Sequence, residues 1–177
     1  MEYSRRTIGI KDQNDIHQVL QALSSLPDLV VVNIAGAAGD KPVLFSRENL
    51  HTILAGAPES LFVEALPIGQ YKSLMGDRID QAIQSTLSLR AMLRTRFAAE
   101  LAAQIREFVA KLEQILPLLN CYALQKAGSS VAENMQKLRN SLGQLTASCR
   151  EHGDNVRCMD DLQYEILPTL KKFLKLF

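Results

Sequence analysis

The chain has 177 residues and a mass of 19.7 kDa, which suits one domain with a substantial core or a small domain joined to a helical module. It is 47% hydrophobic and 22% charged, as in ordinary globular proteins, which excludes a disordered or collagen-like chain. The formal net charge is +1, with 6 basic and 8 acidic residues in 1–76 and 14 and 11 in 77–177. Neither part is basic enough to indicate a nucleic-acid partner through charge alone.

Short apolar runs alternate with amphipathic segments in residues 1–70. Thr7–Ile10 predicts a short strand, and Asp12 is a candidate N-cap for a helix whose apolar residues recur every three to four positions. Leu29–Ala35 is β-branched and apolar apart from one asparagine, which is typical of a strand covered on both faces. Ser46 predicts the start of a second helix, and Leu61–Leu66 a third strand. Because helices connect the strands, we predict a three-stranded, parallel βαβαβ unit over residues 1–70.

Residues 77–177 have a different, helical composition. Residues 77–116 contain no glycine or proline and predict one long helix. Three apolar stripes with spacings of three and four follow the heptad pattern of packed helices. Their members are Leu101, Ile105, Phe108, Leu112, Ile115 and Leu119; Val131, Met135, Leu138, Leu142, Leu145 and Cys149; and Met159, Leu162, Ile166, Leu170, Phe173 and Phe177. We predict an antiparallel three-helix bundle with one long helix.

Two features of the predicted helices need an explanation. Pro117 and Pro168 interrupt helical segments, so we expect a kink or a break at each. The long helix is expected to extend beyond the second helix, and we call the extending part the overhang. Its apolar residues must be buried by the α/β unit, the third helix or another subunit. These residues are Ile79, Ile83, Leu87, Leu93 and Phe97.

The loop that leaves the Leu29–Ala35 strand is a candidate ligand site. A phosphate-binding loop needs several glycine amides that face the anion and a helix directly afterwards. Here Asp40 separates Gly39 from Lys41, and a proline stands where the Walker pattern has a hydroxyl, so a plain strand-exit loop is the favoured interpretation. Gly36, Gly39, Asp40 and Lys41 remain candidate ligand-binding residues, because α/β folds bind ligands at the carboxyl ends of parallel strands.

Two short segments suggest an enzymatic alternative. Asn33-Ile-Ala-Gly36 resembles the Asn-x-Ala-Gly segment of short-chain dehydrogenases, and Tyr122-Ala-Leu-Gln-Lys126 has their Tyr-x-x-x-Lys spacing. The resemblance implies Tyr122 as a proton donor, Lys126 as its electrostatic partner and NAD(P) as cofactor. The sequence lacks a glycine-rich turn after its first predicted strand. A small-ligand or nucleotide-binding enzyme that uses the Gly36–Lys41 loop is therefore the alternative hypothesis.

The three cysteines allow several interpretations. Cys149, His152 and Cys158 have ligand types that zinc prefers, at a helix end where a turn brings residues together. Cys149 also fits the apolar stripe as a buried thiol, and an oxidised link from Cys149 to Cys158 is a third possibility. With Cys121 the chain has three cysteines, an odd number, and it has no Asn-x-Ser/Thr sequon. Both observations favour reduced thiols.

Arginines form the remaining candidate surface. Arg90, Arg94 and Arg96 are the only charged residues between Asp80 and Glu100. They predict a positive patch for an acidic partner, a phosphate or a lipid head group, and the alternative is a solvated helix face.

No complete catalytic set appears in the sequence, and neither a signal peptide nor an apolar run of membrane-spanning length is visible. We therefore predict a cytoplasmic, non-enzymatic protein–protein interaction or regulatory adaptor protein. It is expected to assemble as a homodimer through the bundle of residues 77–177, with no cofactor, nucleic-acid partner or membrane contact.

Overall fold

The computed structural model describes residues 3–9, 16–26, 28–37, 39–98, 100–126, 129–151 and 154–177. Contacts divide the chain into two compact units. The sheet unit comprises residues 1–71 and 117–129, and the helical unit comprises residues 72–116 and 130–177. Residues 117–129, which the sequence analysis placed in the bundle, thus belong with the sheet. The proposed N-cap at Asp12 lies outside the described residues.

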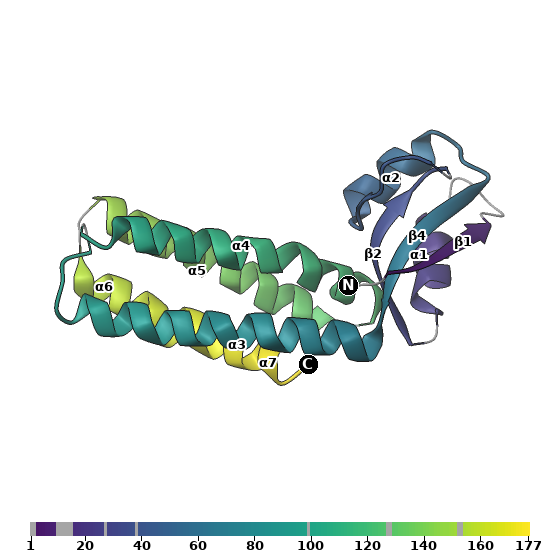
Figure 1. The fold of residues 1–177 in the computed structure, drawn as a ribbon. Coiled ribbons are helices and arrows are strands. Elements are labelled where there is room, and N and C mark those ends of the chain that lie inside the picture. Colours follow the sequence, from purple (N-terminus) through teal and green to yellow (C-terminus); the bar gives the residue numbers. More distant parts are fainter. Residues whose placement is uncertain are drawn as a thin grey trace. The chain divides into compact units, whose positions relative to one another are not determined.

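The sheet unit contains an antiparallel sheet, so the predicted three-stranded parallel sheet is wrong. Its elements are β1 (Ser4–Gly9), α1 (Ile16–Ser24), β2 (Leu29–Ala35), β3 (Val43–Leu44), α2 (Arg47–Ala55) and β4 (Ser60–Pro67) (Figure 1). Among the described residues, the strands form a four-stranded sheet in the order β1-β4-β2-β3. Each neighbouring pair is antiparallel, and β4 lies between β1 and β2.

The two-residue strand β3 explains this topology. It pairs with β2 through Asn33–Leu44 and Ile34–Val43, so the chain has already reversed direction when α2 begins. Helix α2 then returns the chain to the end at which β2 finishes, and β4 starts there, with Phe62 opposite Ala35. A run of two residues carries too little periodicity to predict a strand. A helical crossover is expected to join parallel strands. That expectation fails between β2 and β4, because the connection contains an additional reversal of chain direction at β3.

The apolar run from Leu29 to Ala35 forms β2 with the expected bounds, and every residue in it except Asn33 is buried. A β-bulge interrupts its pairing with β4 between Val31 and Asn33. The core around β2 gathers side chains from both small helices, from β4 and from one helix of later sequence. The buried members of this core are Val19, Leu23, Leu29, Val31, Ile34, Phe45, Leu50, Leu54, Leu61, Val63, Ala65 and Cys121.

The later helix is α4 (Ala102–Gln125), whose last turns complete the sheet unit. The buried side chain of Gln125 accepts a hydrogen bond from the Val31 N–H and donates one to the Val31 carbonyl, both at 2.8 Å. These are the backbone groups of a strand residue that β3 is too short to pair. A side-chain amide thereby takes the place of a neighbouring strand.

The expected helix start at Ser46 is confirmed. The Asn49 N–H donates to Ser46 Oγ at 3.0 Å, which satisfies one of the amides that the first turn of α2 leaves without a helical partner. We expect Ser46→Ala to lower the free energy of unfolding by about 1 kcal/mol. Urea unfolding monitored by circular dichroism measures the effect. Ser88→Ala, at an exposed position inside a helix, is the matched control and should change it by less than about 0.5 kcal/mol.

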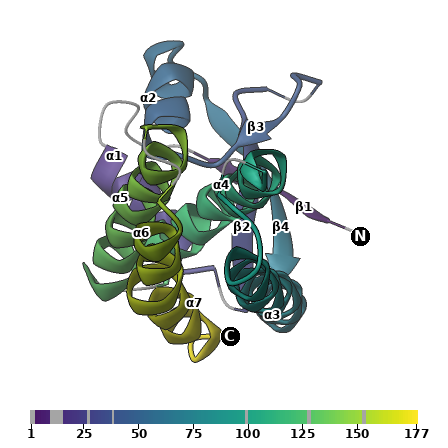
Figure 2. The same cartoon turned by 90° about the vertical axis from the view of Figure 1, so that its left-hand side faces the viewer.

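The helical unit contains four helical segments where three were expected, so the predicted three-helix bundle is wrong. In the described residues they are α3 (Ile68–Leu93), α4, α5 (Ser129–Glu151) and one continuous segment formed by α6 (Asn155–Asp160), η1 (Asp161–Ile166) and α7 (Leu167–Leu174) (Figure 2). The predicted long helix ends at Leu93, and the described residues 94–98, 100 and 101 belong to the connection to α4. None of these described helices combines the length and apolar character needed to cross a membrane.

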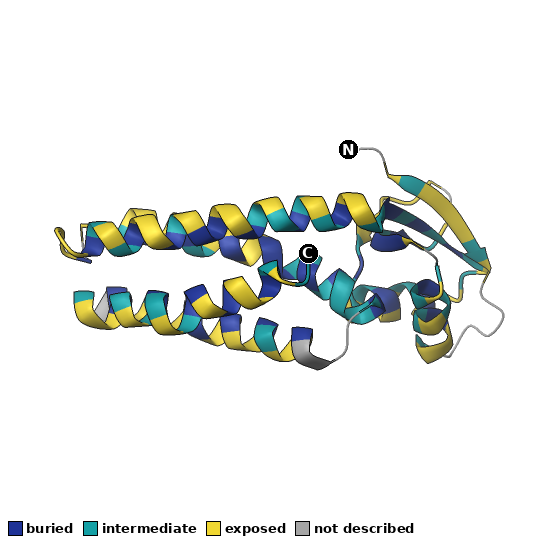
Figure 3. Cartoon of the chain, turned by 90° about the horizontal axis from the view of Figure 1, so that it is seen from below, coloured by how far each residue is buried: buried dark blue, intermediate teal, exposed yellow. Residues whose placement is uncertain are grey.

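The apolar stripes occupy the inner faces of these helices (Figure 3). In the α4 and α5 stripes every member is buried, and in the last stripe Met159 and Phe177 are only half-buried. On the former overhang, Ile79, Ile83 and Leu93 are buried, whereas Leu87 and Phe97 remain 40% and 70% exposed. The bundle therefore covers part of that apolar surface and leaves Phe97 uncovered.

Pro168 lies at the start of α7, directly after the π-helical segment η1. The Leu167 N–H donates to the Leu162 carbonyl, five residues back, in the π pattern. Proline has no N–H and clashes with the preceding turn of an α-helix, and a wider turn accommodates both effects without ending the helix. Pro117 is accommodated inside α4.

Candidate functional site

A pocket of about 300 Å³ opens beside the carboxyl end of β2 in the sheet unit. Gly39 and Asp40, two of the predicted ligand residues, line it together with Arg5 and Glu64 of the neighbouring strands. Gly39 has a φ of 108°, a conformation that favours glycine, and the Asp40 N–H donates to the Ala37 carbonyl at 3.2 Å. Gly39 and Asp40 thus lie in a turn that forms part of the pocket wall.

The other two predicted ligand residues lie elsewhere on the loop. Gly36 lines a second hollow with Asp40, and a Cβ added to Gly36 would approach Ile53 Cγ2 at 3.3 Å. A larger residue at this position would require the Ile53 side chain of α2 to shift by a few tenths of an ångström. Lys41 is not among the residues that line either hollow.

The charges in the β2 pocket do not favour an anion. Glu64 accepts hydrogen bonds from Arg5 Nε at 3.1 Å and from Asn33 Nδ2 at 3.0 Å. Asp40 adds a second carboxylate, while the Arg5 guanidinium is already paired with Glu64. Two carboxylates and one paired guanidinium suit a cationic or neutral ligand better than a phosphate.

The residues of the dehydrogenase-like segments make structural contacts in the sheet unit. Lys126 Nζ donates to the carbonyls of Ser24 and Leu26, each at 2.9 Å, at the C-terminal end of α1, where a cation is favourable. The Tyr122 ring stacks on Tyr71, with centroids 5.8 Å apart. The sheet that contains Asn33 is antiparallel.

The arginine patch spans the end of α3 and the connection from α3 to α4 in the helical unit. Arg94 and Arg96 are exposed, and Arg90 is half-buried on the last turns of α3. Asn155, at the start of α6, fixes this connection through three hydrogen bonds. Its Nδ2 donates to the carbonyls of Leu93 at 2.8 Å and Arg96 at 2.6 Å, and its Oδ1 accepts from the Ala98 N–H at 2.7 Å.

Two apolar side chains stand beside these hydrogen bonds. Phe97, between two residues that Asn155 binds, is 70% exposed, and Val156, directly after Asn155, is 64% exposed. We call Arg94, Arg96, Phe97 and Val156 the basic tip. It combines an aromatic residue and arginines on a fixed turn, which is the composition of many protein–protein contact sites.

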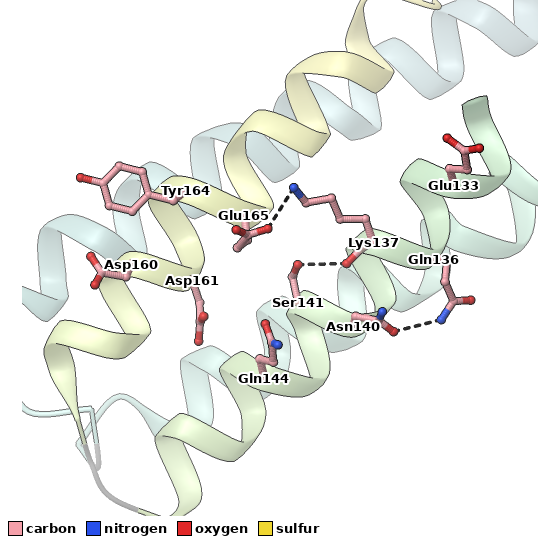
Figure 4. Close-up of a pocket in the computed structure, with 10 residues that line it drawn as sticks. All are labelled: Glu133, Gln136, Lys137, Asn140, Ser141, Gln144, Asp160, Asp161, Tyr164 and Glu165. Atoms are coloured by element: carbon pink, nitrogen blue, oxygen red, sulfur yellow. Dashed lines mark hydrogen bonds and ion pairs between the residues drawn. The ribbon is translucent and has the colours of Figure 1, made fainter. Parts of the chain in front are cut away.

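A polar groove of about 700 Å³ runs between α5 and the α6–η1 segment, and we call it the acidic groove (Figure 4). Four carboxylates and one ammonium line it, a net charge of −3: Glu133, Asp160, Asp161, Glu165 and Lys137. Lys137 Nζ lies 3.1 Å from Glu165 Oε2. In Figure 4, Asp161 points between the two helices, whereas Tyr164 points away from α5 and is 62% exposed.

The π-helical turn supplies several of the groove residues. Asp161, Tyr164 and Glu165 all lie in η1, and such turns occur frequently at functional sites. Burial raises the pKa of the Asp161 carboxyl, and the hydrogen bond from Ser148 Oγ opposes that rise. Burial therefore makes Asp161 a weaker acid than an exposed aspartate.

The structure brings together two of the three predicted metal ligands. Cys149 Sγ and Cys158 Sγ are 2.9 Å apart, and both side chains are buried. His152 lies outside the described residues, and no group of three or more potential metal ligands occurs among those that are described. A hydrogen bond shared by the two thiols lowers the pKa of Cys149, and the same bond, with burial, raises the pKa of Cys158.

Searches of protein-family models, curated proteins and solved structures found no match to this chain.

The arginines of the tip were predicted from the sequence, whereas Asn155 and the acidic groove were not. Asn155 follows Asp154, which caps α6 by accepting hydrogen bonds from the amides of Val156 and Arg157. This helix-start signal is the feature of the sequence that points to Asn155. The groove carboxylates come from α5 and from α6–η1, helices separated by a turn. Neither helix alone contains a sequence pattern that predicts this alignment of carboxylates.

Proposed function

We propose that this chain is a non-enzymatic interaction protein that self-associates through its helical unit, with the basic tip of one copy bound to the acidic groove of a second. The observation that carries the proposal is Phe97, a large apolar side chain 70% exposed on a turn that three hydrogen bonds from Asn155 hold in place. Burying a phenylalanine is worth about 1.5–3 kcal/mol, which favours a partner that covers it.

Pre-organisation strengthens this argument. A side chain on a mobile loop loses conformational entropy when a partner binds, which weakens association. Phe97 instead follows Arg96, whose carbonyl is bound, and precedes Ala98, whose amide is bound. Its backbone is thus already fixed, and less entropy is lost on binding.

Charge complementarity identifies the second copy as the partner. The connection of residues 94–101 carries Arg94, Arg96 and Glu100, and Arg90 precedes it, so the tip region is net positive. The acidic groove carries four carboxylates against one ammonium. A symmetric dimer can form this contact twice, because the tip of each copy meets the groove of the other.

Sedimentation velocity at micromolar concentration tests the proposal. We expect a dimer for the unaltered chain and at least about tenfold weaker self-association for Phe97→Ser, equivalent to about 1.4 kcal/mol. Leu87→Ser removes another exposed apolar side chain, 40% exposed on α3, and is the matched control that should leave the dimer intact. A monomer for the unaltered chain, or equal weakening by both variants, contradicts the proposal.

A second candidate is small-ligand binding at the pocket beside β2, because Gly39 and Asp40 of the predicted loop line it. Its two carboxylates favour an amine over a nucleotide. Thermal-shift assays with spermidine, ATP and NAD(P) compare these ligands. Stabilisation that is lost in both Asp40→Asn and Gly39→Arg supports ligand binding at this pocket, and stabilisation by NAD(P) in particular supports the dehydrogenase-like alternative.

A further inference from the structure

The helical unit contains a pair of thiols with unequal access to solvent. Cys158 is fully buried. Cys149 is also buried from most directions, yet it lines a groove of about 470 Å³ between α4 and α5. The other groove residues are mainly apolar or small, with Arg106, Glu113 and Thr146 as the polar members. A small molecule in this groove therefore reaches Cys149 before Cys158.

The two sulfur atoms lie close enough to react with each other. Their separation is 2.9 Å, and an S–S bond is about 2.0 Å long, so bond formation needs an approach of about 0.9 Å. Cys149 lies near the end of α5, and Cys158 lies in the short helix α6. The bond would close a loop that contains Asn155, the residue that fixes the basic tip.

We propose that Cys149 and Cys158 form a reversible dithiol–disulfide site that reacts with small disulfides entering by the α4–α5 groove. The Cys149 thiolate attacks one sulfur of the small disulfide, whose S–S bond breaks, and a thiolate leaves with the electron pair. Cys149 Sγ is now bonded to the other small sulfur in a mixed disulfide. Cys158 gives its proton to the departed thiolate, and its sulfur attacks Cys149 Sγ, which breaks the mixed disulfide and releases the second small thiolate. That thiolate takes up the proton that Cys149 had lost to solvent. Two protein thiols are oxidised, and one small disulfide is reduced to two thiols.

The electrostatics of the pair agree with this order of events. The hydrogen bond between the thiols favours the thiolate at Cys149 and the protonated form at Cys158. Because Cys149 lines the groove and Cys158 is fully buried, Cys149 is the nucleophile and Cys158 resolves the mixed disulfide. The site is independent of the proposed self-association, because its chemistry needs no second copy.

Cys121 provides an internal control. Its thiol is fully buried in the sheet unit and donates to the carbonyl of Phe45 at 3.2 Å. Burial raises its pKa to about 12, so it holds almost no thiolate near neutral pH. We expect Cys121 to stay reduced under conditions that oxidise the pair.

The experiment equilibrates the full chain in glutathione buffers of increasing oxidised fraction, quenches it with acid, alkylates free thiols after unfolding and maps the peptides by mass spectrometry. We expect an intramolecular Cys149–Cys158 bond, with the loss of two hydrogens in the intact mass, and an alkylated Cys121. Three alkylated cysteines at every buffer composition, or bonds that involve Cys121, would overturn the proposal.

Two serine variants test the assigned roles. Cys158→Ser should trap glutathione on Cys149, because the resolving thiol is absent, whereas Cys149→Ser should leave Cys158 unmodified. Cys121→Ser is the matched control and should retain the intramolecular bond. Equal glutathione addition to Cys149→Ser and Cys158→Ser contradicts the order of attack, and the unaltered chain gives an independent result if a variant fails to fold.

Discussion

Replacing Gln125 by methionine is expected to lower the free energy of unfolding of the sheet unit by about 2–4 kcal/mol. The substitution keeps the length of the side chain but removes its hydrogen bonds to the Val31 N–H and carbonyl. Both backbone groups are then left buried without a partner on a strand whose neighbour β3 ends too early to pair them. A third hydrogen bond, to the Cys121 carbonyl at 2.8 Å, is also lost.

Urea unfolding followed by circular dichroism measures this loss, and hydrogen exchange of residues 29–35 locates it. Gln136→Met is the matched control, because Gln136 is an exposed glutamine whose amide donates to Asn140 on the same helix. We expect the control to change stability by less than about 0.5 kcal/mol. A similarly small change in Gln125→Met would show that the amide does not replace a strand.

The second large effect is expected at Asn155. Asn155→Ala removes the three hydrogen bonds that hold residues 93–98, at a cost of about 2 kcal/mol because the site is only partly buried. The connection that carries Phe97 then loses its fixed conformation. Self-association should weaken as well, although neither the charge nor the apolar surface of the tip has changed.

Hydrogen exchange of residues 94–101 measures the loosening directly, and sedimentation measures its effect on association. Asn155→Asp keeps the acceptor for the Ala98 amide but places a carboxylate opposite two carbonyls, so it should loosen the connection as well. Gln84→Ala, at an exposed position on α3 and outside the acidic groove, is the control. Unchanged exchange in Asn155→Ala would contradict the assigned role.

Elements with local causes were predictable from the sequence. Leu29–Ala35 forms β2 because its apolar, β-branched residues suit a buried strand, and Ser46 begins α2 because its hydroxyl binds the Asn49 amide three residues later. The antiparallel topology was not predictable in this way. It depends on β3, two residues long, and on Gln125, which lies 94 residues from Val31 in sequence.

The end of α3 shows the same limit. Residues 77–116 have the composition of one helix, but Asn155, about sixty residues away, binds the backbone of the connection that interrupts it. Tertiary contacts thus outweigh helix propensity. Of the candidate sites, sequence reasoning found the arginines through their charge and the cysteine pair through its spacing. Their neighbours Phe97, Asn155 and the groove carboxylates became apparent only from the fold.

Charge reversal on each side of the proposed contact tests the self-association most directly. The tip variant Arg94→Glu/Arg96→Glu and the groove variant Glu133→Lys/Asp160→Lys change only exposed side chains. In each variant alone, both contacts of a symmetric dimer pair like charges. In an equimolar mixture, the reversed tip meets the reversed groove, and the unaltered tip meets the unaltered groove. We predict that sedimentation velocity shows monomers for each variant alone and a dimer for the mixture. A mixture that stays monomeric while the unaltered chain is a dimer, or variants that dimerise alone, would contradict the proposed contact.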